Sequence, residues 1–187
     1  NQVGHAAMNT CFPFRVRRGV FVLCCLVAAP GLLSHAAEEF GTVRFDFETG
    51  DLQGWRVLEG GFGLLVCDRA EFHNAAQPYT KQGRWFLSTL EQEGYRPNDS
   101  HTGMLESPVF ELRAPEMTFL AGGGAHPDTY VALCTLDGRE QFRAGGDNSE
   151  VMARRSWNAP GLVGQKCFLR IVDWNQGGWG HITFDDF

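Results

Sequence analysis

The sequence predicts an all-β fold, a jelly-roll β-sandwich built from two antiparallel sheets. Short apolar runs, many of them alternating, recur along residues 42–187 and are separated by glycine-rich turns. The 187 residues include 23 glycines, which suits many tight turns and close backbone approaches. No window of 12 or more residues in this region keeps the 3.6-residue period of a helix. Many short strands at regular spacing are typical of sandwiches and jelly rolls.

The first part of the chain reads as a leader. Arg15, Arg17 and Arg18 precede an apolar run at 20–29, which is the pattern of a secretory signal peptide. A membrane anchor is the alternative, but the run is short for a membrane span and Pro30 interrupts it. The predicted division is a disordered upstream extension at 1–7, a signal peptide at 8–36 and a β-sandwich module at 37–187. We therefore expect a secreted, extracellular protein with no membrane span after cleavage.

The charge of the predicted module bears on its partners. Cleavage removes three arginines and leaves 13 basic against 22 acidic residues, a net charge of −9. Nucleic acid needs a basic face, so we expect no nucleic-acid partner. The acidic balance suits a soluble exported module, including one that binds a cation.

Strands are expected in chain order wherever an apolar run ends at a turn. The predicted strands are 42–47, 55–59, 63–67, 84–89, 103–107, 109–112, 117–121, 130–136, 140–144, 149–157, 167–173 and 181–187. Asp137-Gly138 is the strongest hairpin signal, because Asp-Gly favours the turns that join antiparallel strands. A charged loop is expected at 91–101 and a turn at 159–164.

Three cysteines remain after the predicted cleavage: Cys67, Cys134 and Cys167. An odd number in an exported protein leaves one free or pairs one with another chain. Cys134 and Cys167 both lie in predicted strands, so a disulfide between neighbouring strands is possible, and the sequence leaves the pairing open. Asn98-Asp99-Ser100 is a glycosylation sequon in a polar loop.

Five acidic residues near the two ends of the module form the first candidate site: Asp46, Glu48, Asp51, Asp185 and Asp186. The first and last strands of a jelly roll commonly pair, which would bring these carboxylates together. Ca²⁺ takes six to eight oxygen ligands of this kind, so we predict a structural calcium. Asp46 and Glu48 share one face of a strand, whereas Asp185 and Asp186 point to opposite faces. The alternative is that all five are solvated edge charges that discourage edge pairing.

Aromatic and planar polar residues form the second candidate site, for a carbohydrate. Sugar rings stack on Trp and Tyr faces, and Arg, Asn, Asp and His bind the hydroxyls. The predicted ligand-binding residues are Trp174, Asn175, Trp179, His181, His126 and Arg155, with Tyr79 and Tyr95 as further candidates. Trp174 lies in a polar loop and is the expected exposed platform, whereas Trp179 lies between glycines and suits a packed turn equally well. Trp55, Trp85 and Trp157 lie in apolar runs and are expected in the core.

Other site classes find little support in the sequence. Gly122-Gly123-Gly124 is followed by neither a Lys-Ser/Thr pair nor a helix, so a phosphate loop is not expected. These glycines instead suit a close approach to a neighbouring strand or a ligand. No C-x-x-C pair or histidine cluster of zinc type occurs in the predicted module. No serine lies in a nucleophile-elbow motif. We expect no enzyme activity from this module.

Several segments together resemble known exported modules. They are Phe47-Glu48-Thr49-Gly50, Gly54-Trp55, 102–110, 122–127, 155–157, 171–173, 177–182 and Asp185-Asp186. The pattern resembles secreted β-jelly-roll modules of the galactose-binding or carbohydrate-binding type, including the accessory module beside family 32 glycoside hydrolases (levanase or fructanase type). It is also similar to MAM-type adhesion domains. The resemblance implies a structural calcium near the termini.

The family 32 catalytic domain itself has no counterpart in this chain. Its nucleophile lies in an Asn-Asp-Pro motif, and the nearest string, Pro97-Asn98-Asp99-Ser100, lacks the final proline. We therefore predict a non-catalytic binding module whose partner is a carbohydrate or a protein surface. Two alternatives stay open: an ancillary N-terminal domain of a larger secreted glycoside hydrolase, with activity elsewhere in the parent, and a MAM-like adhesion domain.

Overall fold

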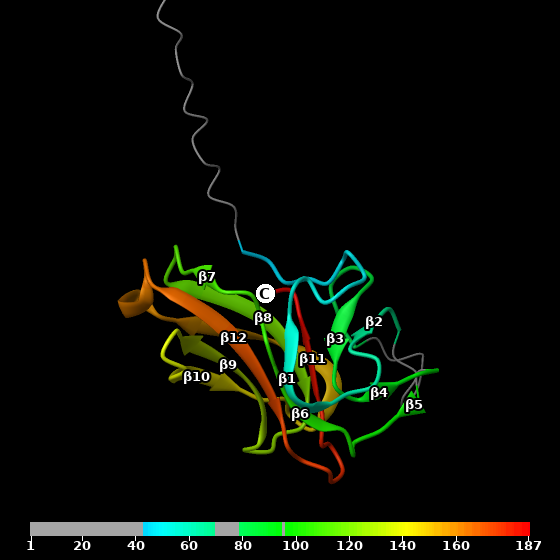
Figure 1. The fold of residues 1–187 in the computed structure, drawn as a ribbon. Coiled ribbons are helices and arrows are strands. Elements are labelled where there is room, and N and C mark those ends of the chain that lie inside the picture. Colours follow the sequence, from blue (N-terminus) through cyan, green and yellow to red (C-terminus); the bar gives the residue numbers. More distant parts are fainter. Residues whose placement is uncertain (1–42, 70–78, 95) are drawn as a thin grey trace, which may run out of the picture. The chain divides into compact units, whose positions relative to one another are not determined.

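Two antiparallel sheets packed face to face make up the described part of the protein (Figure 1). The structure is a computed structural model that describes residues 43–69, 79–94 and 96–187. The predicted leader and Tyr95 lie outside these residues. The all-β prediction is confirmed: the described helical structure is limited to a 3₁₀ turn at Pro160–Leu162. Within the described residues no helix is long and apolar enough to cross a membrane.

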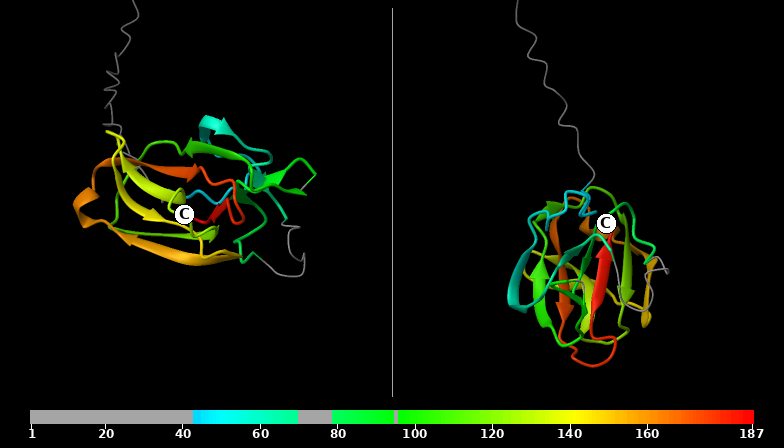
Figure 2. Two further views of the ribbon diagram at one scale, coloured as in Figure 1. Left: turned by 90° about the horizontal axis from the view of Figure 1, so that it is seen from below. Right: turned by 90° about the vertical axis from the view of Figure 1, so that its right-hand side faces the viewer.

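Strands from distant parts of the chain alternate between the two sheets. Sheet A contains, in spatial order, β1 (Arg56–Gly61), β6 (Thr102–Glu106), β12 (Lys166–Asp173), β9 (Thr129–Thr135) and β10 (Glu140–Ala144), with β7 (Phe110–Glu111) also beside β12. Sheet B contains β11 (Ser149–Asn158), β8 (Glu116–Gly123), β13 (Ile182–Asp185), β3 (Phe86–Ser88) and β2 (Val66–Cys67). The chain crosses between the sheets after β1, between β3 and β6, and after β7, β8, β10, β11 and β12, so the two layers lie over a shared core (Figure 2).

The core lies between the sheets because each strand turns alternate side chains inward. On β12, Leu169 and Ile171 face this core, and on β13 Phe184 does so without exposed surface. The Phe184 ring lies 5.7 Å from the centroids of both Trp55 and Phe119. These are contact distances for aromatic pairs, so the rings form one packed cluster.

The predicted core tryptophans are found in or against this cluster. Trp55 and Trp157 are buried, and Trp85 is partly buried against the same residues. The predicted hairpin is also confirmed. Gly138 adopts a positive φ of 80°, and the Gly138 amide donates to the Thr135 carbonyl at 2.8 Å between β9 and β10.

The two ends of the described chain pair directly. The Phe45 amide donates to the Phe187 carbonyl at 2.9 Å, and the Phe187 amide returns the bond at 3.1 Å. Their rings stack with centroids 6.0 Å apart. The described part of the predicted first strand, 43–47, is therefore paired as expected, although it is too short and irregular to form a ladder.

Two local predictions differ from the structure. The predicted loop 91–101 contains a small two-stranded sheet, β4 (Glu91–Gln92) and β5 (Arg96–Pro97). The predicted strand 63–67 is regular only at β2. In both places the regular strands have only two residues each, too few for alternation to reveal them.

The possible disulfide between Cys134 and Cys167 is wrong. In the register of β9 and β12, Cys134 lies opposite Phe168, and Cys167 lies opposite Thr135. Adjacent positions on a pleated strand face opposite sides of the sheet, so Cys167 joins the main core while Cys134 packs with Ala132 and Phe168 on the outer face. Both, like Cys67, are free and buried.

Replacing Phe184 with Ala tests the core described here. The substitution leaves a cavity against the rings of Phe47, Trp55 and Phe119, and we expect a loss of about 3–5 kcal/mol in the free energy of unfolding. Urea denaturation measures it. Leu136→Ala, at an exposed hairpin position, is the control and should change stability by less than about 0.5 kcal/mol. Equal losses in the two variants would contradict the assignment.

Candidate functional site

Five of the six predicted ligand-binding residues lie in two adjacent loops, 124–128 after β8 and 174–181 between β12 and β13. We call this pair of loops the loop end. The Trp174 amide donates to the Asp128 carbonyl at 2.9 Å, and the His126 ring Nε2 lies 3.1 Å from the Gly178 carbonyl. The structure thus brings Trp174, Asn175, Trp179, His181 and His126 together.

Trp174 is the exposed aromatic side chain of the loop end. It is 40% exposed, as a stacking platform requires. Asn175 instead shapes the loop: its amide donates to Asp128 Oδ1 at 3.2 Å, and its carbonyl oxygen accepts from the Gly177 amide at 2.9 Å. The tryptophan is therefore presented on a loop whose backbone is fixed by several hydrogen bonds.

The exposure of Trp179 lies between that of exposed Trp174 and that of buried His181. Its side chain is partly buried, its φ is +65°, and its ring lies 5.9 Å from the His181 ring. The Trp179 carbonyl passes so close to Gly124 that a Cβ at position 124 would come within 2.0 Å of it. The predicted close approach at the Gly122-Gly124 run is therefore real, and the neighbour is this loop.

The prediction that His181 contacts a ligand from the surface does not hold, because its side chain is 1% exposed. Nδ1 lies 2.6 Å from Asp99 Oδ1, and Nε2 lies 3.2 Å from Glu150 Oε2. Burial by itself would lower the pKa of His181, but the hydrogen bonds to the two carboxylates raise it to about 9. His181 therefore joins the 174–181 loop to β11 and to the loop before β6 as a buried ion-pair bridge.

Two buried carboxyl groups beneath the loop end were not singled out by the sequence analysis. Asp173 and Glu91 are 0% and 1% exposed. Burial raises the pKa of Asp173 to about 7 and that of Glu91 to about 6, although Ser88 donates a hydrogen bond to Glu91. A signal for Asp173 existed, since it continues the inward alternation of Leu169 and Ile171 on β12. Raised pKa values are also found in catalytic acids, but both of these carboxyl groups are buried.

The remaining predicted ligand residues lie apart from this group. Arg155 is on β11 and pairs with Asp147 at 2.6 Å. Tyr79 is 3% exposed and packs edge-to-face on Phe86 at 5.7 Å in a second core cluster. Tyr79 is therefore a packing residue.

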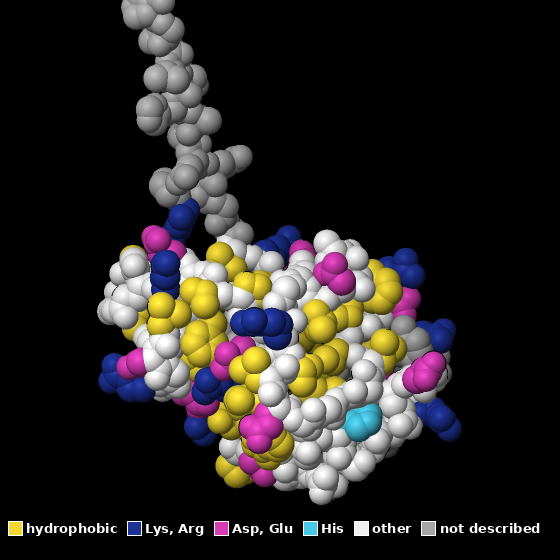
Figure 3. Space-filling model, in the orientation of Figure 1, with side chains coloured by type: hydrophobic (Ala, Val, Ile, Leu, Met, Phe, Trp, Pro, Cys, Tyr) yellow, Lys and Arg dark blue, Asp and Glu magenta, His cyan; other side chains and the backbone are white. Residues whose placement is uncertain are grey.

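A network of charged side chains covers the outer face of sheet A. Arg170 binds Glu106 at 2.6 Å and Glu140 at 3.4 Å. Arg143 pairs with Glu140 and lies 4.2 Å over the Tyr130 ring. The face drawn in Figure 3 accordingly mixes basic, acidic and hydrophobic side chains without a patch of one sign. Because these residues come from four strands, only the strand register brings them together.

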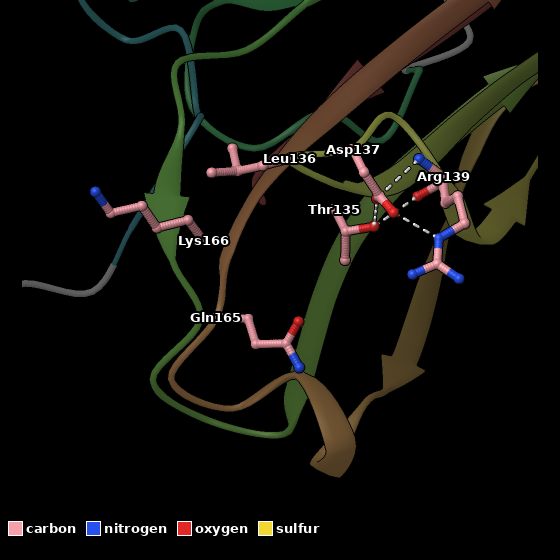
Figure 4. Close-up of a pocket in the computed structure, with 6 residues that line it drawn as sticks. All are labelled: Thr135, Leu136, Asp137, Arg139, Gln165 and Lys166. Carbon is pink, nitrogen blue, oxygen red and sulfur yellow. Dashed lines mark hydrogen bonds and ion pairs between the residues drawn. The ribbon is translucent and has the colours of Figure 1, made fainter.

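An open pocket of about 410 Å³ lies at the β9–β10 hairpin. It is lined by Thr135, Leu136, Asp137, Arg139, Gln165 and Lys166 (Figure 4). Asp137 already accepts hydrogen bonds from Thr135 at 2.6 Å and from Arg139 at 2.7 Å. Three of its polar residues, Thr135, Asp137 and Arg139, therefore bind one another, which makes the pocket a weaker candidate than the loop end.

The predicted calcium ligands are distributed over two contacts between the chain ends. Asp46 pairs with Arg44 at 3.2 Å and accepts from the side-chain amide of Gln53 at 3.0 Å. Asp186 lies between two guanidinium groups, at 3.0 Å from Arg44 and 2.7 Å from Arg154. The first of these contacts is therefore an arginine bridge.

The second contact joins Glu48 and Asp185 to one segment. Glu48 Oε1 accepts from the Arg84 and Trp85 amides at 2.8 Å each. Asp185 Oδ2 accepts from the Gln82 amide at 2.7 Å. Burial raises the pKa of Asp185 to about 7, although the hydrogen bonds from the Gln82 and Asp186 backbone amides lower it.

This arrangement does not fit a site of six to eight oxygen ligands. The fifth residue, Asp51, is exposed and accepts from Thr49 and the Gln53 amide in its own turn. Among residues 43–69, 79–94 and 96–187, no three His, Cys, Asp or Glu side chains are grouped to hold a metal ion. The predicted meeting of the two ends is found, whereas calcium binding itself stays a prediction.

Comparisons with known proteins give one sequence relative and several structural ones. No family model matches the chain. It is 31% identical over 87 residues to the inferred glycosyl hydrolase ecdE of Aspergillus rugulosus, a match that covers 46% of this chain and 12% of that relative. The chain therefore spans only a small part of the length of this relative.

The solved structures that resemble the chain are remote in sequence. The carbohydrate-binding module TmCBM61, solved with β-1,4-galactotriose, matches with a TM-score of 0.47 and 19% identity over 75% of this chain and 90% of that one. The K1 adhesin domain of Lys-gingipain from Porphyromonas gingivalis W83 matches with a TM-score of 0.48 and 15% identity over 78% and 96%. The K3 domain of the same protein gives 0.47 and 12% over the same shares.

Because His181 bridges two carboxylates, we expect the free energy of unfolding to fall as the pH rises. Its folded pKa of about 9 exceeds the ordinary 6.5, so its contribution is complete below pH 6.5 and lost as the pH rises to 9. We expect this group to remove roughly 3 kcal/mol across that window. Urea denaturation at several pH values should give a flatter profile for His181→Gln, while the half-buried His126→Gln keeps the wild-type slope. Parallel slopes for wild type and His181→Gln would refute the bridge.

Burial of the Asp173 carboxyl group should cause a second change in stability, at lower pH. Its folded pKa of about 7 exceeds the ordinary 3.8, so stability falls as the pH rises from about 4 to 7 and the buried group is forced to ionise. Asp173→Asn cannot ionise, so relative to wild type it should gain roughly 3–4 kcal/mol between pH 4 and pH 7. Hydrogen bonds from Thr135 and Arg139 lower the pKa of Asp137, so its own pH dependence lies below about pH 4 and Asp137→Asn, as the control, should keep the wild-type slope between pH 4 and pH 7.

Proposed function

We propose that the chain is a non-catalytic carbohydrate-binding module that holds its ligand at the loop end. The observation that carries the proposal is the exposure of Trp174 on a loop fixed by hydrogen bonds to the neighbouring loop. A flat indole beside carboxylate, amide and imidazole groups offers a sugar one stacking face and several hydroxyl partners. The site is a surface platform rather than a deep pocket.

The position of this loop in the fold supports a binding role. It joins β12 to β13, which are the central strands of sheet A and sheet B. Both strands are largely buried, so the ends of the loop move little. A rigid attachment of this kind lowers the entropy lost when a ligand immobilises the platform.

The sequence relative supports an ancillary role beside a hydrolase. Identity of 31% to a glycosyl hydrolase extends over 87 residues, a short part of that protein. Catalysis by this chain is not proposed, because the described carboxyl groups with raised pKa values, Asp173, Glu91 and Asp185, are buried. The proposal therefore assigns this chain the binding step and leaves any hydrolysis to a larger parent protein outside the cell.

A second candidate is adhesion through protein contacts, as in MAM-like domains. It is favoured by β1, an edge strand whose six residues are all exposed, with Val57 and Leu58 at 40% and 50%. An exposed edge strand can pair with a strand of another chain. Concentration-dependent self-association without glycan binding would favour this candidate.

Glycan-array binding followed by calorimetry tests the first proposal. Trp174→Ala removes the stacking face, and we expect at least a roughly tenfold loss of affinity for the glycan that wild type selects. Leu136→Ala, an exposed apolar position at the opposite hairpin, is the matched control and should bind as wild type does. A wild type silent on the array would refute carbohydrate binding. Unchanged affinity in Trp174→Ala would refute the loop end as the site.

A further inference from the structure

The segment 80–85, which we call the clasp loop, is bound through its amides by carboxylates from both ends of the described chain. Glu48 accepts from the Arg84 and Trp85 amides, and Asp185 accepts from the Gln82 amide. Residues separated by more than 130 positions are therefore held by a single turn. Glu48 accepts both bonds on Oε1, whereas Asp185 accepts from Gln82 on Oδ2 and from the Asp186 amide on Oδ1.

The carbonyl side of the clasp loop faces a cation of the chain itself. The Lys81 ammonium donates to the Gly83 carbonyl at 2.8 Å and to the Arg84 carbonyl at 2.6 Å. Carbonyl oxygens that converge beside carboxylates are the ligands that Ca²⁺ takes in loops. Here a primary ammonium, with three donors on a flexible stem, occupies their meeting point.

Close packing holds this arrangement in place. A Cβ at Gly83 would come within 2.4 Å of the Glu48 carboxylate, and the φ of Gly83 is +62°, so glycine is required there. The start of the loop is fixed by Thr80, whose hydroxyl donates to the Met152 carbonyl at 2.6 Å. The turn therefore approaches Glu48 at contact distance.

The carboxylates of Asp46 and Asp186, near the two chain ends, also have cationic partners within the chain. Asp186 is neutralised by Arg44 and Arg154, and Asp46 by Arg44. We infer that the two chain ends are closed without a metal ion, and that Lys81 is the built-in cation of the clasp loop. The acidic residues that suggest calcium in the sequence then bind guanidinium and amide groups of the same chain, while the Lys81 ammonium binds the carbonyls of the clasp loop.

Thermal unfolding of the wild-type chain, with and without metal, tests the inference directly. We expect the same Tm in EDTA and in millimolar CaCl₂. Tb³⁺ supplies an optical readout, because the Trp85 amide binds Glu48 and an ion held at this loop would lie near the Trp85 indole. Wild type should give no sensitised Tb³⁺ emission. A Tm that falls in EDTA or rises with Ca²⁺ would overturn the inference.

A matched pair of lysine variants separates Lys81 from general charge effects. Lys81→Met removes two charge-assisted hydrogen bonds, and we expect Tm to fall by roughly 3–8 °C. Lys166→Met, at an exposed position at the start of β12, should leave Tm within about 1 °C of wild type. Equal Tm values for Lys81→Met and wild type would contradict the role given to Lys81. Should Lys81→Met fail to fold, the wild-type response to EDTA and Ca²⁺ decides.

Discussion

The pairing of β12 and β13 with their neighbours is the constraint on which this fold depends. These strands are formed by residues 166–185, yet they occupy the centres of sheet A and sheet B. Their inward side chains meet those of strands formed much earlier in the chain. Neither sheet is complete until the last residues are added, so most of the stabilising contacts are long-range and must be formed together.

The strand β13 also connects the two polar regions of the molecule. Immediately before it, His181 joins Asp99 and Glu150 beneath the loop end. At its other end, Asp185 binds the clasp loop. One short, buried strand therefore fixes both the loop that carries Trp174 and the closure of the chain ends. Buried charge at each end is held by partners from distant segments, which favours one register over alternatives at some cost in desolvation.

Local patterns in the sequence were sufficient for much of this architecture. Alternation located most strands of both sheets to within one or two residues, and Asp137-Gly138 located the hairpin, because turn chemistry and strand period are properties of neighbouring residues. The gathering of Trp174, Asn175, Trp179 and His126 in one region was also predictable, since these residues lie in loops that follow predicted strands. The small sheet at 91–97 was not predictable, because its two strands have two residues each.

By itself, the sequence determined the fold class, the aromatic core and the meeting of acidic residues at the chain ends. Only the tertiary structure decided what those residues contact. Strand neighbours and their register decide three features of the structure. They set the sheet faces on which Cys134 and Cys167 lie. They also bury His181 and pair Arg170 with Glu106 and Glu140. The roles of Glu48 and Asp185 likewise follow from the position of the clasp loop. Strand register is a long-range property, fixed by burying the whole core at once, so no local pattern of residues contains it.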